Sequence, residues 1–151
     1  VVLSAICETA SCLPDAVQLL TPCTAGNGRL RVVNLGRYAV SLCDKQDGVG
    51  VRVHLDPGRL PGWDEIRSWH LKLKTKKEQD AARLQDEIRR AGQSIGRLHP
   101  VRVKPGLLAR SSKGSIAICG MCREAYPLKD GEVCLGCQGQ APYETPAASI
   151  G

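Results

Sequence analysis

The chain has 151 residues, of which 42% are hydrophobic and 24% are charged, a composition typical of a folded globular protein rather than a disordered chain. This length is sufficient for one ordinary hydrophobic core and a small second domain. No apolar run approaches the length of a membrane span and we find no secretory signal, so we expect a cytoplasmic protein with no membrane partner.

The net charge of +6 is concentrated in one segment. Residues 63–110 contain 12 Lys and Arg and 6 Asp and Glu, whereas the rest of the chain contains 9 of each kind. The favoured interpretation of such a segment is a solvated helix face, and nucleic-acid binding is the alternative. Aromatic residues make up only 3% of the chain, which leaves few rings on which single-stranded bases could stack and disfavours nucleic acid.

The first half of the chain predicts strands around one helix. Pro14 suits a first helical turn and Pro22 ends the helix, whereas Gly26 to Gly28 tolerate the positive φ of a turn. In chain order we predict a buried strand at residues 1–6, a helix at 14–21 and a turn at 26–28. Three strands are predicted to follow, at residues 29–35, 37–43 and 49–55. This order predicts an α+β fold, with an antiparallel β-meander packed on helices.

The basic segment predicts two helices, a short one at residues 63–72 and a longer one after it. Thr75 and Glu78 have the spacing of a capping box, which predicts that the longer helix begins there. We expect Lys76, Lys77, Arg83 and Arg90 to be exposed on it. The opposite, buried face is predicted to contain Ala81, Leu84, Ile88, Ala91 and Ile95. After this helix we predict an extended piece at residues 99–105 and a linker at 111–114. A strand at 115–118 and a flexible tail at 141–151 are predicted to follow.

Four cysteines near the C-terminus have the spacing of zinc ligands. Cys119, Cys122, Cys134 and Cys137 form two Cys-x-x-Cys pairs separated by 11 residues. Two such turns can place four thiolates tetrahedrally around Zn²⁺. The intervening residues 123–133 predict a β-hairpin with its turn at Asp130-Gly131. We therefore predict one structural zinc per chain in a zinc-ribbon or treble-clef-like domain at residues 115–140, with a redox dithiol, an iron–sulfur cluster or disulfides as alternatives.

A second candidate site surrounds the predicted N-terminal helix. Cys12 precedes the helix, where the helix dipole favours a thiolate, and Cys23 follows it. The polar residues of this candidate site are Glu8, Cys12, Asp15, Gln18, Cys23 and Asn27. From the residues alone, buried cysteines that pack as small hydrophobes are the favoured interpretation, and a metal site or redox chemistry is the alternative.

A family resemblance supports the functional alternative. Four segments of the chain are similar to motifs of the formylmethanofuran dehydrogenase FmdE family. They are the pattern from Glu8 and Cys12 to Asp15-Ala16-Val17-Gln18, the turn T-P-C-T-A-G-N-G at 21–28, the step G-R-Y-A at 36–39 and V-R-V at 51–53. Members of this family often carry a C-terminal four-cysteine zinc domain, which residues 115–138 resemble. The resemblance implies an FmdE-like α+β domain at residues 1–110.

The chain departs from the family pattern in two places. The family usually begins with an H-G-H-x-C-P-G motif whose His and Cys help to bind a metal against the cysteine of the T-G-C-T turn. This chain has no such motif, and Pro22 replaces the glycine beside Cys23. The resemblance therefore implies part of a site for a second transition metal. Its sulfur ligand would be Cys23, helped by Cys12 and placed at the lip of a polar concave site near Glu8 and Gln18.

The leading hypothesis is a metal-binding accessory protein of molybdenum- or tungsten-dependent formyl or formate metabolism. We expect it to act as a homo-oligomer, such as a dimer, or with a molybdenum or tungsten enzyme partner. We find no complete catalytic set, so the sequence leaves open whether the protein is an enzyme. Two alternatives remain: a zinc-ribbon nucleic-acid-binding module, and a thiol-based redox or sulfur-handling protein that uses Cys12 and Cys23.

Overall fold

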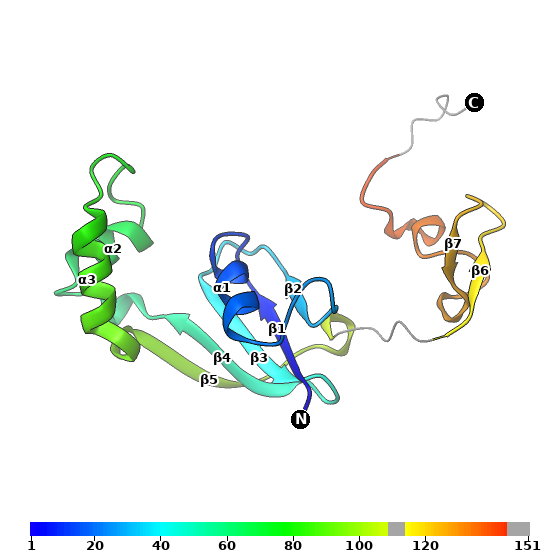
Figure 1. The fold of residues 1–151 in the computed structure, drawn as a ribbon, viewed down its shortest axis with the longest axis horizontal. Coiled ribbons are helices and arrows are strands. Elements are labelled where there is room, and N and C mark those ends of the chain that lie inside the picture. Colours follow the sequence, from blue (N-terminus) through cyan, green and yellow to red (C-terminus); the bar gives the residue numbers. More distant parts are fainter. Residues whose placement is uncertain (109–113, 145–151) are drawn as a thin grey trace. The chain divides into compact units, whose positions relative to one another are not determined.

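The computed structural model describes residues 1–108 and 114–144 (Figure 1). The chain divides into two compact units, Val1–Ala109 and Arg110–Gly151, called here the main unit and the C-terminal unit. Residues 111–113 of the predicted linker and 145–151 of the predicted tail lie outside the described residues. Among the helices of the described residues, none has both the length and the apolar character needed to cross a membrane.

Within residues 1–108, the main unit combines a sheet with three α-helices. The strands are β1 (Leu3–Cys7), β2 (Leu30–Val32), β3 (Ala39–Asp44), β4 (Val49–Leu55) and β5 (Gly96–Arg102). The α-helices are α1 (Leu13–Leu20), α2 (Asp64–His70) and α3 (Ala81–Ala91). Short 3₁₀ turns occupy Pro57–Arg59, Gly92–Ile95 and Pro105–Leu107.

The five strands form one sheet in the order β2-β1-β3-β4-β5. All neighbours are antiparallel except β1 and β2, which run parallel. The predicted α+β class with a largely antiparallel sheet is confirmed. The expectation that the strand at 29–35 begins a meander is wrong. Helix α1 carries the chain back past β1, so the next strand pairs with β1 in parallel instead of with β3.

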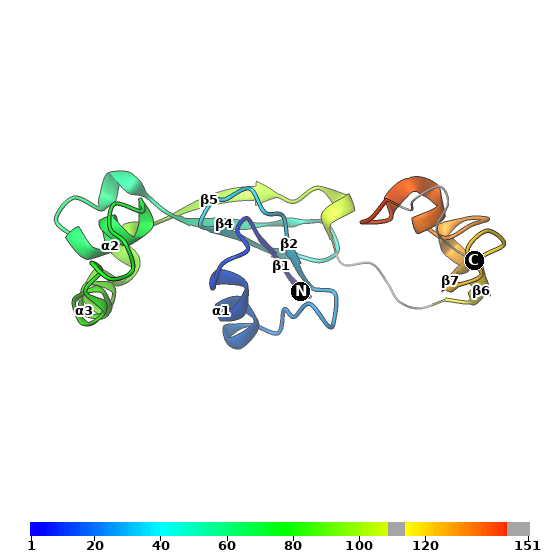
Figure 2. The same ribbon diagram turned by 90° about the horizontal axis from the view of Figure 1, so that it is seen from above.

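Helix α1 covers one face of the sheet (Figures 1 and 2). Its Val17 packs against Ala5 and Cys7 of β1 and Leu30 of β2. Among the apolar residues of this helix only Val17 is buried; Leu19 and Leu20 are 86% and 81% exposed. The buried face of this short helix is therefore narrow, and Val17 is the one residue of α1 that is buried against the sheet.

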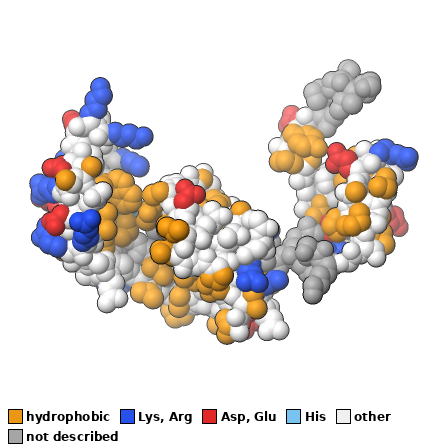
Figure 3. Space-filling model, in the orientation of Figure 1, with side chains coloured by type: hydrophobic (Ala, Val, Ile, Leu, Met, Phe, Trp, Pro, Cys, Tyr) orange, Lys and Arg blue, Asp and Glu red, His pale blue; other side chains and the backbone are white. Residues whose placement is uncertain are grey.

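Helices α2 and α3 form an arm at the end of the sheet, beyond β4 and β5 (Figure 2). A separate small core holds the arm together, made of Leu60, Ile66, Ala91 and Ile95. Figure 3 shows Lys and Arg side chains over this arm and hydrophobic side chains between the arm and the rest of the main unit. The predicted exposure of Lys76, Lys77, Arg83 and Arg90 is confirmed.

The predicted buried face of α3 is only partly right. Ala91 and Ile95 are buried and Leu84 is half-buried, but Ala81 is exposed and Ile88 is 47% exposed. The Thr75–Glu78 capping box does form, because the Thr75 N–H donates to Glu78 Oε2 at 2.8 Å. It closes a turn before the helix, however. The cap of α3 is Asp80, whose side chain accepts from the Arg83 N–H.

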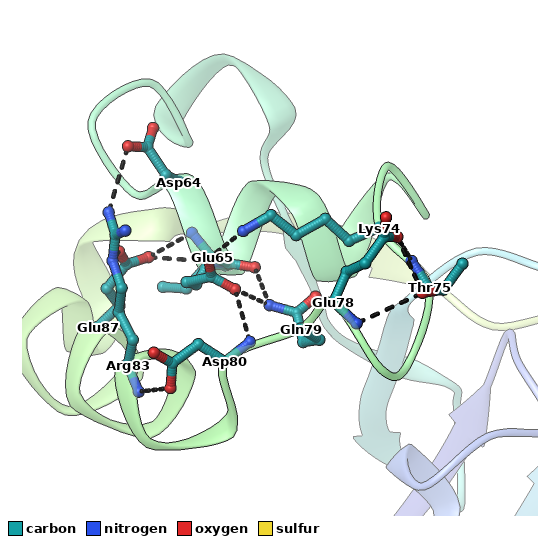
Figure 4. Close-up of polar contacts among 10 residues, drawn as sticks. Asp64, Glu65, Lys74, Thr75, Glu78, Gln79, Asp80, Arg83 and Glu87 are labelled. Atoms are coloured by element: carbon teal, nitrogen blue, oxygen red, sulfur yellow. Dashed lines mark hydrogen bonds and ion pairs between the residues drawn. The ribbon is translucent and has the colours of Figure 1, made fainter.

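Two buried glutamates organise the arm (Figure 4). Glu87 is 2% exposed, and its Oε2 accepts from the N–H groups of Glu65 and Ile66 at 2.9 and 3.1 Å. It therefore satisfies the N-terminus of α2, whose own cap residue makes no side-chain cap. Glu65, also 2% exposed, accepts from Lys74 and Gln79 and fixes the loop between the helices.

Removing the Ile66 side chain should destabilise the arm. Ile66 is 1% exposed, and Ile66→Ala should lower the free energy of unfolding by about 2–5 kcal/mol through lost burial and a residual cavity. The exposed Lys77 provides a control, since Lys77→Ala should change it by less than about 0.5 kcal/mol. Urea denaturation measures both values, and equal losses would contradict this packing.

Acid should weaken the arm through Glu65. The hydrogen bond from Lys74 lowers the pKa of Glu65, with burial opposing it and the Asp80 N–H adding to it. A carboxylate with a lowered folded-state pKa stabilises the fold above its unfolded pKa of about 4.3, and this stabilisation is lost as the pH falls through the folded-state pKa. Unfolding free energy measured from pH 7 to pH 3 should therefore fall less in Glu65→Gln than in the wild type.

The matched control is Asp15→Asn, because the exposed Asp15 side chain has no hydrogen-bond or ion-pair partner among the described residues. Its pH dependence should follow that of the wild type. If Glu65→Gln did the same, the ion pair with Lys74 would not contribute to acid stability.

Candidate metal centre

The four C-terminal cysteines come together at the ends of short elements. Strands β6 (Ile116–Ile118) and β7 (Ala125–Pro127) pair antiparallel, and Cys119 and Cys122 lie in the turn that joins them. Cys134 and Cys137 lie on the second knuckle, which runs into a helical turn at Gly136–Gln140. The predicted hairpin within 123–133 is wrong in its register, because the first Cys-x-x-Cys itself forms the hairpin turn.

The sulfur positions match a tetrahedral metal site. All four Sγ atoms lie within 4.8 Å of one another, and they form the one cluster of three or more potential metal ligands among the described residues. The Cys119–Cys137 and Cys122–Cys134 sulfur distances are 3.8 and 3.6 Å. Four sulfurs at about 2.3 Å from a zinc ion are about 3.8 Å apart, so the cluster fits this ion.

Backbone N–H groups point at the sulfurs. The Cys134 N–H lies 3.5 Å from the Cys119 sulfur, and the Cys137 N–H lies 3.4 Å from the Cys134 sulfur. Hydrogen bonds from the backbone of Cys122 and Cys134 lower the pKa of Cys119 to about 6. The pKa of Cys137 is raised to about 12, chiefly because its thiol is hydrogen bonded to Cys134. Metal binding to this set therefore has to displace protons.

Two side chains fix the loop that carries the second knuckle. The buried Tyr126 hydroxyl donates to the carbonyl oxygens of Gly131 and Glu132, at 3.0 and 2.9 Å. Gln138 Nε2 donates to the carbonyl oxygens of Asp130 and Val133, at 2.7 Å each. These bonds hold the ligand-bearing backbone in position from outside the cluster, and such supporting bonds commonly orient the ligands of metal sites.

The structure does not assemble the predicted N-terminal site. Cys23 is 0% exposed and belongs to the apolar core with Ala5, Val17 and Leu30, so its expected place at the lip of a polar site is wrong. Cys12 is exposed, with its sulfur 3.7 Å from the Tyr38 hydroxyl. A fully buried thiol cannot meet a substrate from solvent, which argues against redox chemistry by Cys12 and Cys23.

The other residues of that predicted site have structural partners. Asn27 Oδ1 accepts from the N–H groups of Thr24 and Arg29, and Gln18 Oε1 accepts from the Ala25 N–H, so both stabilise the glycine turn. Asp15 is exposed. Glu8 is 8% exposed and forms ion pairs with Arg37 and Arg52.

A cluster of basic residues on β4 and β5 was not predicted from the sequence. The three histidines are isolated in sequence, yet His54 Nε2 and His99 Nε2 lie 3.0 Å apart. Arg52 lies directly opposite His99 in the register of these strands. Alternation along β4 places Arg52 and His54 on one face, but residues 99–105 were predicted only as an extended piece without a strand partner, so the pairing of β4 with β5 was not predicted.

Comparisons with known proteins agree with this architecture. Residues 2–103 match the family described as "FmdE, Molybdenum formylmethanofuran dehydrogenase operon". Residues 110–144 match the family described as "FmdE treble clef zinc finger". Of the two folds predicted for the C-terminal domain, the treble clef is therefore the right one.

Two individual proteins are similar to this chain. A "Probable S-adenosyl-L-methionine-binding protein" of Archaeoglobus fulgidus is 30% identical to this chain over 150 residues. The match covers 89% of this chain and 40% of that protein, so the chain spans less than half the length of this curated relative. A crystal structure of a tungsten formylmethanofuran dehydrogenase FmdE-like protein from Syntrophus aciditrophicus resembles this structure with a TM-score of 0.71. The two sequences are 56% identical, and the match covers 95% of this chain and 75% of that one. The chain belongs to the FmdE family and carries its treble clef zinc finger.

Proposed function

We propose that this chain is a zinc-binding accessory protein of molybdenum- or tungsten-dependent formyl or formate metabolism. The observation that carries the proposal is the family match over residues 2–103, whose description refers to the operon of molybdenum formylmethanofuran dehydrogenase. The solved relative is named after the tungsten form of this enzyme. In this proposal the chain acts on the enzyme through direct contact or through its cofactor.

The zinc in this proposal has a structural role, with one ion per chain. Cys119, Cys122, Cys134 and Cys137 supply four sulfur ligands within one cluster. A set of four protein ligands leaves no open position for water or substrate, as in structural zinc sites. When bound, the ion therefore supplies folding free energy to the C-terminal unit, whose own apolar core is small.

An apolar groove on the main unit supports contact with an enzyme partner. The groove has a volume of about 360 Å³, and Leu13, Val53 and Trp69 are among the residues that line it. It lies between α1, the α2–α3 arm and the sheet, and Figure 3 shows hydrophobic side chains between the arm and the rest of the main unit. Ile88 and Leu98 also line it and are 47% and 64% exposed. Exposed apolar patches of this kind mark protein interfaces. We assign the groove to the molybdenum or tungsten enzyme.

Nucleic-acid binding has less support, because several basic side chains of the arm are already paired. Lys74 binds Glu65, Arg83 binds Asp64 and Glu87, and Arg90 binds Asp86. Each pair removes a cation that could contact phosphate. The arm is better described as a solvated helical surface with its own ion pairs.

Loss of one sulfur ligand should release the zinc. Cys134→Ser should lower the zinc content from one ion per chain to near zero and make the C-terminal unit sensitive to protease. Structural zinc contributes on the order of 10 kcal/mol in small finger peptides, far more than this small core can replace. Elemental analysis and limited proteolysis measure the two effects, and melting of the main unit should be unchanged.

The matched control is Cys12→Ser, which removes an exposed thiol outside the cluster. This variant should keep one zinc per chain. Retention of tightly bound zinc by Cys134→Ser would show that the four-cysteine assignment is wrong, and two ions in the wild type would contradict the stoichiometry.

Deleting the gene should impair the partner enzyme. A strain without it should show lower activity of its molybdenum- or tungsten-dependent formylmethanofuran or formate dehydrogenase, restored by the wild-type gene. Ile88→Glu, which places a charge in the apolar groove, should fail to restore the activity. Lys77→Glu, a charge change on the exposed surface of the arm, should restore it.

Size-exclusion chromatography with light scattering on the purified proteins tests whether the loss of dehydrogenase activity comes from a loss of binding. Binding of the dehydrogenase by the wild type and not by Ile88→Glu is the expected result. A chain that is dimeric alone and monomeric as Ile88→Glu would instead assign the groove to a second copy. Unchanged dehydrogenase activity in the deletion strain would contradict the proposed function.

A further inference from the structure

The sheet face opposite α1 is only half covered. Val103 and Leu107 pack over Ile6 and Cys43 on that face. Beyond them the face stays open, and alternation along β4 and β5 directs four basic side chains toward it. The strand register pairs Arg52 with His99 and His54 with Arg97, so the four form one block across the two strands.

Two arginines at this open face share one buried carboxylate. Arg37 donates from Nη2 to Glu8 Oε1, and Arg52 donates from Nε to Glu8 Oε2 at 2.5 Å. A guanidinium has five N–H donors, and one arginine alone can bind both oxygens of a carboxylate. Here each arginine uses one nitrogen. Among the described residues, both Nη groups of Arg52 and the Nε and Nη1 groups of Arg37 have no protein acceptor.

These donors line a pocket. Its volume is about 320 Å³, and Arg37, Arg52, His54, His70 and Tyr38 are among its lining residues. A second pocket of about 120 Å³ shares Tyr38 and His70 with it. That pocket is also lined by Trp69 and Lys72, and the Tyr38 and Trp69 rings meet edge to face with centroids 5.2 Å apart. A cationic pocket therefore continues into an aromatic one.

The local charge is positive before any imidazole is protonated. Three guanidinium groups, of Arg37, Arg52 and Arg97, face two carboxylates, of Glu8 and Asp56. His54 and His99 add two rings in contact, stacked with an interplanar angle of 10°. Arginine forks suit planar carboxylates and phosphates, and a concave site with one sign of charge concentrates the opposite ion.

We propose that this pocket binds the carboxylate or phosphate group of a small organic anion, with Arg37 and Arg52 as its principal donors. The Glu8 carboxylate holds the two guanidinium groups in place and thereby preorganises them. The adjoining rings of Tyr38 and Trp69 accept a planar part of the same ligand. The site lies wholly within the main unit and is independent of the four-cysteine cluster.

All three histidines of the chain line or adjoin this pocket, so their imidazole resonances report on it directly. The full-length zinc-bound protein would be titrated with inorganic phosphate and, separately, with acetate, at constant ionic strength balanced with sodium chloride. The expected result is a saturable shift of the His54 and His99 resonances with one of the two probes. Saturation with phosphate assigns a phosphate group to the ligand, and saturation with acetate assigns a carboxylate.

Arg37→Gln tests the donor role. It should weaken probe binding at least about tenfold, as expected for a lost charge-assisted hydrogen bond. Arg52 still pairs with Glu8 in this variant, so the fold should persist, which the unchanged spectrum of the core would verify. The control Arg89→Gln makes the same change in net charge at an exposed α3 position with no side-chain partner among the described residues.

Three results would overturn the proposal: shifts that stay linear with both probes, shifts that sodium chloride reproduces, or equal weakening in Arg37→Gln and Arg89→Gln. Each would mean that the arginines only neutralise Glu8 and that anions interact with the general charge of the protein.

Discussion

One buried carboxylate, that of Glu8, joins the separate parts of the main unit. Its backbone N–H donates to the Ala39 carbonyl, and its own carbonyl accepts from the N–H groups of Leu35 and Arg37. Its side chain binds Arg37 and, across β3, Arg52 on β4. A single residue thus connects the end of β1, the loop before β3, and β4. Loss of both arginines would leave a buried carboxylate without partners, which costs several kcal/mol.

The C-terminal unit depends on a different constraint. Cys119 and Tyr126 are its buried apolar residues within 114–144, which is too small a core for independent stability. Four sulfurs close together need a cation to hold them, and the knuckles supply backbone N–H groups that favour thiolates. Packing and ion pairs therefore stabilise the main unit, whereas the C-terminal unit has a cluster of four sulfurs that can hold a metal ion. This division agrees with the proposals of a structural zinc in the C-terminal unit and of a partner surface on the main unit.

The sequence was most informative where a local pattern has one physical solution. The Cys-x-x-Cys spacing predicted which four sulfurs come together, because two tight turns of this kind bring their cysteines to one point. Pro14 and Pro22 bound α1 for the equally local reason that proline begins a helix well and cannot continue it.

The sequence was insufficient where a distant partner decides the outcome. Glu87 is buried because it satisfies the N-terminus of α2, 21 and 22 residues away in sequence, which no helical periodicity reveals. Cys23 is buried because β2 pairs with β1 and closes the core over it. His54 and His99 meet through a strand register set across 45 residues. Each of these positions depends on tertiary pairing rather than on local pattern.

Zinc K-edge X-ray absorption on the purified full-length chain tests the central claim most directly, because it reports the element and its ligand atoms together. A structural zinc held by four cysteines predicts four sulfur neighbours at about 2.3 Å and no nitrogen or oxygen bound to the metal. A different metal, or a coordination sphere that contains nitrogen or oxygen ligands, would contradict a structural zinc held by Cys119, Cys122, Cys134 and Cys137.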